Sequence, residues 1–299
     1  MEKKLKSWSF LQSSEEIDVG RFFEYDEDAL RMFSEWLSFL KLPKIRILEV
    51  GSGNGFFTNK LLEMFPEIDL VCLEPDVSFV KILEKRFGNR ISIVNEKVEK
   101  MNFKDESFDA VISHIVIHNL YDPIEALNEM KRVIKSKGRL ITIEPLPASR
   151  QYYPDKKIEE AADYLFKAQI IKTIKYNEET MKNTDINPWK NNYPDFFEKV
   201  GLNNITCHGW TSIFTLSDNR FDFKERKTWI TNRKKLVESK KLETTKILIE
   251  SGEKQEQIDE AYNILLSYFT KLEEASNEEL DHIHEQEIVH RIIAIGQKT

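Results

Sequence analysis

The stretch that decides the fold is Ile45-Arg-Ile-Leu-Glu-Val-Gly-Ser-Gly-Asn-Gly55. Its first half is a short apolar run, as expected for a parallel strand that is covered on both faces. Glycines follow at 51, 53 and 55, and a helical pattern begins at Phe56. Glycine permits positive φ and close approach of a ligand to the backbone. The stretch therefore predicts a strand, a glycine turn and a helix N-terminus that form a ligand cradle of exposed N–H groups. A tight turn without a ligand is the alternative.

Further strand patterns follow along the chain, and helical patterns separate most of them. They lie at 70–73, 91–94, 110–114, 139–145, 205–214 and 287–296. Strands that alternate with helices are typical of a doubly wound α/β fold. We therefore predict a seven-stranded, mostly parallel sheet.

Several polar residues fall where the predicted strands end. Glu74 closes the second strand about 20 residues after the glycines, a position from which an acidic group binds ribose hydroxyls in nucleotide folds. Lys97 and Val98 follow the third strand, and residues 113–118 follow the fourth. Ligands of open α/β sheets bind at the carboxyl ends of the strands. These residues are therefore expected to meet at one edge of the sheet.

Composition excludes several classes of protein. The chain has 299 residues, a formal net charge of −7 and two cysteines. An acidic balance argues against a nucleic-acid partner, and we interpret the basic run 224–241 as a solvated helix face. No apolar run has the length of a membrane span. We expect a cytoplasmic protein without a disulfide framework, and the sequence leaves its oligomeric state open.

The sequence from about 41 to 145 resembles the class I S-adenosylmethionine-dependent methyltransferases, which have a Rossmann-like fold. The resemblance rests on Glu49-x-Gly51-x-Gly53-x-Gly55 and on five further segments in consistent order. These are Leu73–Asp76, Phe103–Ser113, residues 118–119, Glu129–Leu140 and residues 143–145. The resemblance implies that the cofactor is S-adenosyl-L-methionine and that the product is S-adenosyl-L-homocysteine.

The resemblance also implies roles for individual residues. Glu49 would orient the glycine loop, whose backbone lies against the cofactor, and Glu74 would bind both ribose hydroxyls. Lys97 and Val98 would flank the adenine, although Lys97 departs from the usual Asp and cannot accept a hydrogen bond. The predicted cofactor-binding residues are Glu49, Gly51, Ser52, Gly53, Gly55, Glu74, Pro75, Lys97, Val98, Ser113 and His114.

Methyl transfer needs positioning, and it needs a base when the nucleophile must lose a proton. His118 is the candidate base because histidine titrates near neutrality; a pocket wall or a structural histidine is the alternative. The predicted substrate pocket holds Phe22, Tyr25, His118 and Asn119. We interpret His282, His284 and His290 as a polar loop before the last strand and predict no metal site.

The resulting domain plan places helical segments around the cofactor-binding core. It consists of an N-terminal lid (1–40), the core (41–150), a helical insertion (151–192), a return to the sheet (193–216), a helical cap (217–286) and the last strand (287–299).

The expected activity is methylation of a small molecule. A subunit that binds the cofactor without activity is one alternative. An NAD-dependent oxidoreductase is another, but its fingerprint requires glycine where Phe56 stands.

Overall fold

The computed structural model of the chain describes residues 14–120, 122–146, 150–180 and 192–299. The chain divides into two compact units. The first unit comprises Met1–Ala148, Ile186–Ser212 and Val289–Thr299, and the second comprises Ser149–Asp185 and Ile213–Ile288.

The described strands form a single mixed sheet. They are β1 (Arg46–Val50), β2 (Asp69–Leu73), β3 (Ser92–Val94), β4 (Phe108–His114), β5 (Ile134–Pro145), β6 (Arg150–Tyr152), β7 (Asn203–Thr215) and β8 (Gln286–Gln297). Their order is β3-β2-β1-β4-β5-β8-β6, and β7 also pairs with β8. Strands β1 to β5 pair in parallel, whereas β8 is antiparallel to β5 and β6. The predicted α/β fold is confirmed, with eight strands instead of seven because the short β6 was not foreseen.

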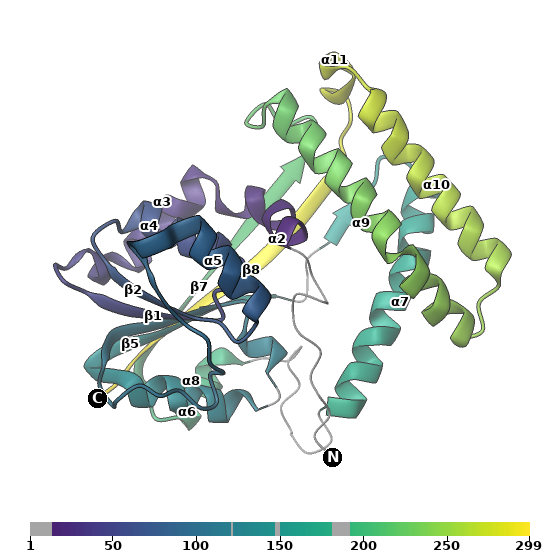
Figure 1. Cartoon of the computed structure of the whole chain (residues 1–299). Helices are drawn as coiled ribbons and strands as arrows, with labels where there is room; N and C mark the ends of the chain where they lie inside the picture. The colour runs from purple at the N-terminus through teal and green to yellow at the C-terminus, as the bar shows by residue number, and fades with distance from the viewer. Residues whose placement is uncertain (1–13, 121, 147–149, 181–191) are drawn as a thin grey trace. The chain divides into compact units, whose positions relative to one another are not determined.

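Helices cover both faces of the sheet in the first unit, as Figure 1 shows. They are α2 (Ser14–Arg21), α3 (Glu27–Trp36), α4 (Phe56–Met64), α5 (Val77–Phe87), α6 (Pro123–Val133) and α8 (Tyr193–Lys199). Short 3-10 helices are η1 (Phe22–Tyr25), η2 (Ser38–Lys41), η3 (Gly88–Arg90) and η4 (Ile117–Asn119). One core lies beneath α6 and α8, and the other lies beneath α3, α4 and α5.

Strand alternation assigns side chains to these two cores. In β1, Leu48 and Val50 join the core beneath α6, whereas Ile47 joins the core beneath α4. All three are at most 2% exposed, because a parallel strand is covered on both faces. The apolar run after Ile45 thus reflects burial on both sides of the sheet.

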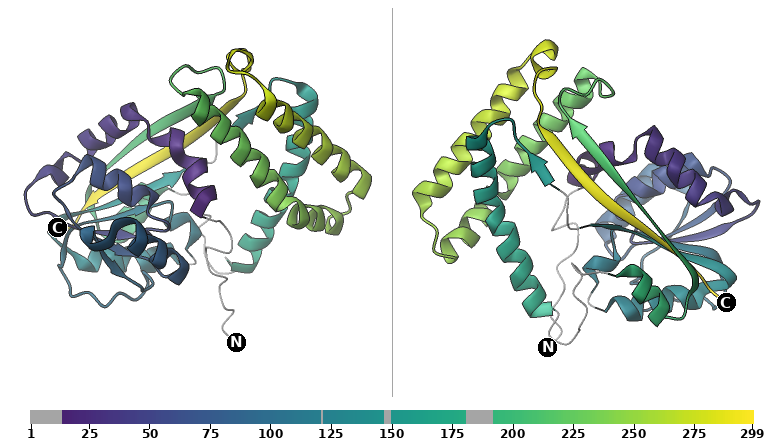
Figure 2. Two further views of the ribbon diagram at one scale, coloured as in Figure 1. Left: turned by 45° about the horizontal axis from the view of Figure 1, so that its top comes forward. Right: turned by 180° about the vertical axis from the view of Figure 1, so that it is seen from behind.

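The second unit is mainly helical. It contains α7 (Lys156–Thr180), α9 (Phe223–Glu250), α10 (Gln255–Glu274) and the short α11 (Asn277–Leu280). Helices α7, α9 and α10 lie side by side (Figure 2). The backbone turns at Gly252 with φ +97, so glycine separates α9 from α10.

Gly138 lies within β5 and does not cap a helix. Helix α6 ends at Val133, and β5 begins directly after it at Ile134. A Cβ at Gly138 would lie 2.7 Å from the backbone oxygen of Asp109. This glycine therefore allows a close approach between β5 and the start of β4.

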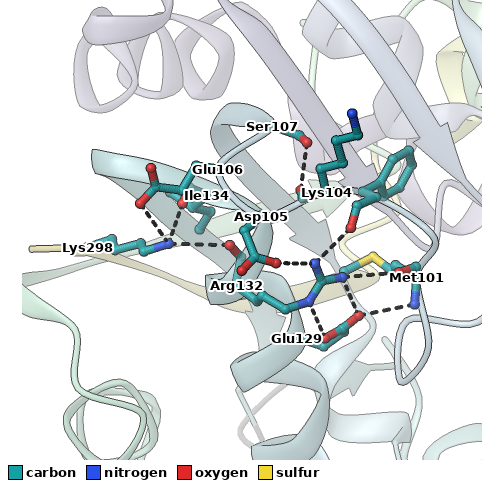
Figure 3. Close-up of polar contacts among 10 residues, drawn as sticks. Met101, Lys104, Asp105, Glu106, Ser107, Glu129, Arg132, Ile134 and Lys298 are labelled. Carbon is teal, nitrogen blue, oxygen red and sulfur yellow. Dashed lines mark hydrogen bonds and ion pairs between the residues drawn. The ribbon is translucent and has the colours of Figure 1, made fainter.

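Arg132 fastens α6 to the long loop between β3 and β4 (Figure 3). Its guanidinium donates to the backbone oxygens of Met101 and Phe103 and to the carboxylates of Asp105 and Glu129. These bonds use all three guanidinium nitrogens, with distances of 2.7–3.0 Å. The loop that carries Val98 is thus anchored at its far end.

Candidate active site

The glycine loop turns sharply at the carboxyl end of β1. Gly51, Gly53 and Gly55 all have positive φ, at 70°, 55° and 86°. A Cβ at Gly51 would lie 2.5 Å from a methyl group of Val116, and a Cβ at Gly55 would lie 2.4 Å from the ring of Phe87. A Cβ at Gly53 would meet nothing within 4 Å. Gly51 and Gly55 are thus required by packing, whereas Gly53 presents its backbone to open space.

Glu74 reaches this loop from the end of β2, as the sequence predicts. One carboxylate oxygen accepts a 2.7 Å hydrogen bond from the amide of Gly53, and the other accepts one of 2.9 Å from the amide of Asp76. Burial raises the pKa of Glu74. Pro75 next to it is exposed. A carboxylate offers about four lone-pair sites, so these two bonds leave acceptor capacity for a diol.

Glu49 lies inside the first unit. Its carboxylate accepts a 2.6 Å hydrogen bond from the hydroxyl of Thr58 in α4 and is within 3.5 Å of the Cys72 sulfur. Burial raises the pKa of Glu49 to about 7. The hydroxyl of Ser52, in the glycine loop, donates to the backbone oxygen of Glu49 at 3.4 Å. The acidic side chain thus ties β1 to α4 beneath the loop.

The residues predicted to flank the adenine follow β3. Lys97 is exposed, whereas Val98 is buried in the core beneath α6. The structure also shows a contact that the sequence analysis missed. The side-chain amide of Asn95, which lies two residues before Lys97, donates to the backbone oxygen of Glu74 at 2.7 Å. The end of β2 and the loop after β3 are thereby joined.

Ser113 and His114 end β4 and point to opposite faces of the sheet, as neighbours in a strand do. The Ser113 hydroxyl is buried and has no hydrogen-bond partner among the described residues. The His114 ring stacks on Phe57 at 4.5 Å, and its Nε2 shares a hydrogen bond with the hydroxyl of Tyr25. Burial, with Arg21 nearby, lowers the pKa of His114 well below its usual range, so the imidazole is neutral.

The N-terminal segment lies against this edge of the sheet. Tyr25 is 2% exposed within the core beneath α4, so its ring packs inside the first unit. The side chain of Phe22 lies outside the part of the chain that the structure describes. The amide of Asn54 in the glycine loop donates to Ser14 and to Asp18 of α2 at 2.8–3.0 Å. Helix α2 is thereby tied directly to the predicted cradle.

His118 stands on η4, just beyond β4. Its Nδ1 lies 2.7 Å from a carboxylate oxygen of Glu144, which is fully buried at the end of β5. The side chain of His118 is 17% exposed, and its Nε2 has no hydrogen-bond partner among the described residues. Asn119 turns back, and its amide donates to the backbone oxygen of Ile115 at 3.2 Å.

Sequence analysis did not single out Glu144, Asn54 or Asn95. The position of Glu144 was the available signal. It is an acidic residue at the end of the apolar strand β5, and β5 pairs with β4, the strand that precedes His118. The two asparagines carried no comparable signal, since the acceptors of their side-chain NH2 groups lie at least 21 residues away along the chain.

The described residues contain no group of three side chains that could hold a metal ion. In the same ranges, no helix combines the length and the apolar composition needed to span a bilayer.

Comparisons with known proteins agree on a family for the region around the glycine loop. Residues 48–142 match the family described as methyltransferase domain. The chain is 30% identical over 117 residues to demethylmenaquinone methyltransferase of Thermotoga maritima, covering 39% of this chain and 51% of that protein. It is 31% identical over 113 residues to malonyl-[acyl-carrier protein] O-methyltransferase of Legionella pneumophila, covering 37% and 39%. The chain thus spans about half or less of these relatives.

A solved structure shares the fold over a longer stretch. Phosphoethanolamine N-methyltransferase 2 of Haemonchus contortus, in complex with S-adenosyl-L-methionine, aligns with a TM-score of 0.50 at 14% identity. The alignment covers 100% of this chain and 62% of the nematode protein. At this identity the likeness concerns the fold alone.

Proposed function

We propose that this chain, whose residues 48–142 match the methyltransferase domain family, is a class I S-adenosylmethionine-dependent methyltransferase that transfers a methyl group to a small-molecule acceptor. The net charge of −7 supports a small acceptor over a nucleic acid, whose phosphates favour a basic surface. The acceptors named for the two relatives are a quinone precursor and a malonyl carrier.

The observation that carries the proposal is the meeting of Glu74 with the amide of Gly53. It joins an acidic residue at the end of β2 to Gly53, the glycine of this loop whose Cβ position faces open space. A buried carboxylate with free lone pairs fits two ribose hydroxyls, and the backbone beside it leaves room for the rest of a nucleoside. The residues therefore fit S-adenosylmethionine.

Several parts of the first unit would hold the cofactor. Backbone from Gly51 to Gly55 would lie against its methionine and ribose portions, and Glu74 would accept from the ribose. Val98 and the exposed stem of Lys97 would flank the adenine, and the unpartnered hydroxyl of Ser113 would face the sulfonium end. When bound, the cofactor supplies a methyl group that is already activated by the positive charge on sulfur.

The residues of the chain then have two tasks, which are to orient the acceptor and to accept its proton. His118 is our candidate for the second task, because its ring is partly exposed and lies next to the strand end that carries Ser113 and His114. It follows by two residues Val116, whose side chain packs on Gly51, which supports a position near the glycine loop.

Cofactor binding is tested first. Calorimetry with S-adenosylhomocysteine and, separately, with NAD should show binding of the first ligand only, because Phe56 replaces the glycine that the NAD fingerprint needs. Glu74→Ala should weaken S-adenosylhomocysteine at least tenfold, whereas the exposed Glu84→Gln should bind as the wild type does. NAD binding, or an unchanged affinity in Glu74→Ala, would contradict the proposal.

Activity is tested separately. The protein is incubated with methyl-labelled S-adenosylmethionine and a small-molecule extract of cells, and the labelled product is isolated. Label in a small molecule supports transfer. Tight binding of S-adenosylhomocysteine without any labelled product would instead support a subunit that binds the cofactor and lacks activity.

A further inference from the structure

Three successive residues of one turn donate to the same buried carboxylate. The amides of Val116 and Ile117 donate to Oε1 of Glu144 at 3.2 and 2.9 Å. The ring of His118 meets Oε2 of the same residue at 2.7 Å. Glu144 is 0% exposed, so this arrangement replaces the water that the carboxylate would otherwise bind.

The two oxygens of Glu144 have different tasks. Oε1 accepts two backbone N–H bonds, and a carboxylate can only accept hydrogen bonds. The partner at Oε2 must therefore be a donor, so Nδ1 of His118 carries the hydrogen. In the neutral ring the lone pair then resides on Nε2, which has no partner among the described residues.

The turn that precedes His118 contains a residue in a strained backbone conformation. Ile115, between β4 and η4, has φ +58, a region that β-branched residues rarely adopt. Its amide donates to the backbone oxygen of Ile143 at 2.7 Å, which anchors the turn to β5. Strained residues persist where the surroundings over-determine them, and they cluster at functional sites.

The same turn touches the predicted cofactor cradle. A Cβ on Gly51 would overlap the side chain of Val116, so the two residues are in direct contact. The turn that orients His118 is thus packed against the glycine loop on one side and bonded to Glu144 on the other.

We infer that Glu144 is a positioning residue that fixes the tautomer of His118, so that Nε2 takes a proton from the methyl acceptor. This inference rests on the proposed function and adds the class of acceptor. The acceptor must carry a removable proton, as a hydroxyl, a carboxyl, a carbon acid or an N–H group does. A thioether or a tertiary amine, which has no such proton, would need neither residue.

The bonds balance in this scheme. The acceptor atom loses its proton to Nε2, and its electron pair forms the new bond to carbon. The electron pair of the broken sulfur–carbon bond stays on sulfur, which becomes neutral. The proton on His118 then leaves to solvent, and the ring returns to its starting form.

Glu144→Gln is the sharpest test, because an amide has only one oxygen. The two backbone N–H groups at Oε1 require that oxygen, so the NH2 group of the glutamine would face His118. Nδ1 must then accept, and the hydrogen moves to Nε2. The variant would thus hold the inverted tautomer while the shape of the site is kept.

The tautomer is read by nitrogen NMR of histidine-labelled protein at about pH 8, where an ordinary imidazole is neutral. His118→Asn identifies the His118 signals among those of the six histidines. We expect Nδ1–H in the wild type and Nε2–H in Glu144→Gln. Glu129→Gln, which removes a carboxylate of the Arg132 cluster, is the matched control and should leave the His118 tautomer unchanged.

Nε2–H at His118 in the wild type, or the same tautomer in Glu144→Gln as in the wild type, overturns the inference. This measurement needs no acceptor and no cofactor, so it does not depend on the proposed function. Should Glu144→Gln fail to fold, as judged by circular dichroism, the wild-type tautomer still decides.

Activity gives the second test once a labelled product has been found. Glu144→Gln and His118→Asn should each lower kcat by about 10²–10⁴-fold, with the affinity for S-adenosylhomocysteine within twofold of the wild type. The product should be an ester, an ether, or a C-methyl or N-methyl compound formed from a protonated acceptor. A sulfonium or quaternary ammonium product, or full activity in either variant, contradicts the inference. Failure of S-adenosylhomocysteine to bind any of the proteins would instead refute the proposed function.

Discussion

The amide of Asn54 donates a 2.8 Å hydrogen bond to the carboxylate of Asp18, which lies 36 residues earlier in the chain. Asp18 also pairs with Arg86 of α5, so one carboxylate joins α2, the glycine loop and α5. Asp18→Ala should release α2, and hydrogen exchange of the amides in 14–21 should become roughly tenfold faster, because about 1–2 kcal/mol of charge-assisted bonding is lost from a half-exposed site.

Asp28→Ala is the control for this experiment. Among the described residues, Asp28 pairs only with Arg31 on the exposed face of α3, and its loss should leave exchange in α2 unchanged. Equal exchange rates in Asp18→Ala and the wild type would show that other contacts hold α2 in place.

Tyr25 and His114 form a neutral buried pair, and the structure favours a structural role for both over contact with a substrate. Tyr25→Phe leaves Nε2 of His114 without its hydrogen-bond partner inside an apolar core. We expect a loss of about 1–3 kcal/mol in the free energy of unfolding, measured by urea denaturation. Tyr25→Phe should also retain the wild-type kcat; a large drop in kcat with unchanged stability would return Tyr25 to the acceptor site.

The sequence was informative where one local pattern carries the chemistry. The glycine turn and Glu74 are separated by about one β–α unit, and the spacing alone predicts that they meet.

The alternation of side chains along a strand also predicts which face of the sheet each residue occupies. Since Ser113 and His114 are neighbours in β4, their side chains point to opposite faces of the sheet, although the sequence analysis grouped both as cofactor-binding residues.

Other contacts could not be predicted because they depend on the three-dimensional register. Glu144 meets His118 only because β5 lies beside β4 with Ile143 opposite His114. Asn54 meets Asp18 only because α2 packs on the glycine loop, which no periodicity reveals. The apolar pattern places the elements, whereas their polar partners follow from how those elements are aligned.

Arg132 should be more important for stability than its partial exposure suggests. Its bonds reach two backbone oxygens and two carboxylates, and the flexible ammonium of lysine cannot reproduce that planar set. Arg132→Lys should lower the free energy of unfolding by about 2 kcal/mol in urea. Arg31→Lys, on the exposed face of α3, should stay within about 0.5 kcal/mol; equal effects of the two substitutions would show that the Arg132 cluster adds nothing.

Glu49 should make stability depend on pH in an unusual direction. Burial raises its pKa from 4.5 to about 7, so the folded state holds the proton more tightly than the unfolded chain does. The contribution of Glu49 to stability is therefore fully present below about pH 4.5 and is lost as the pH rises through about 7, by on the order of 3 kcal/mol at most. Glu285 in the second unit, whose pKa burial also raises to about 7, acts with the same sign.

Thermal melts between pH 4.5 and 8 measure this effect. Glu49→Gln cannot ionise, yet its amide can still accept from Thr58. The substitution should therefore flatten the pH dependence, with the largest gain in melting temperature relative to the wild type at the alkaline end. Glu285→Gln should reduce the pH dependence of the melting temperature by the contribution of Glu285. The double variant should depend on pH less than either single variant does. A wild-type protein whose stability rises from pH 4.5 to 7, with no change in slope for Glu49→Gln, would show that Glu49 is ionised in the folded state. Its bond to Thr58 would then be an ordinary carboxylate contact.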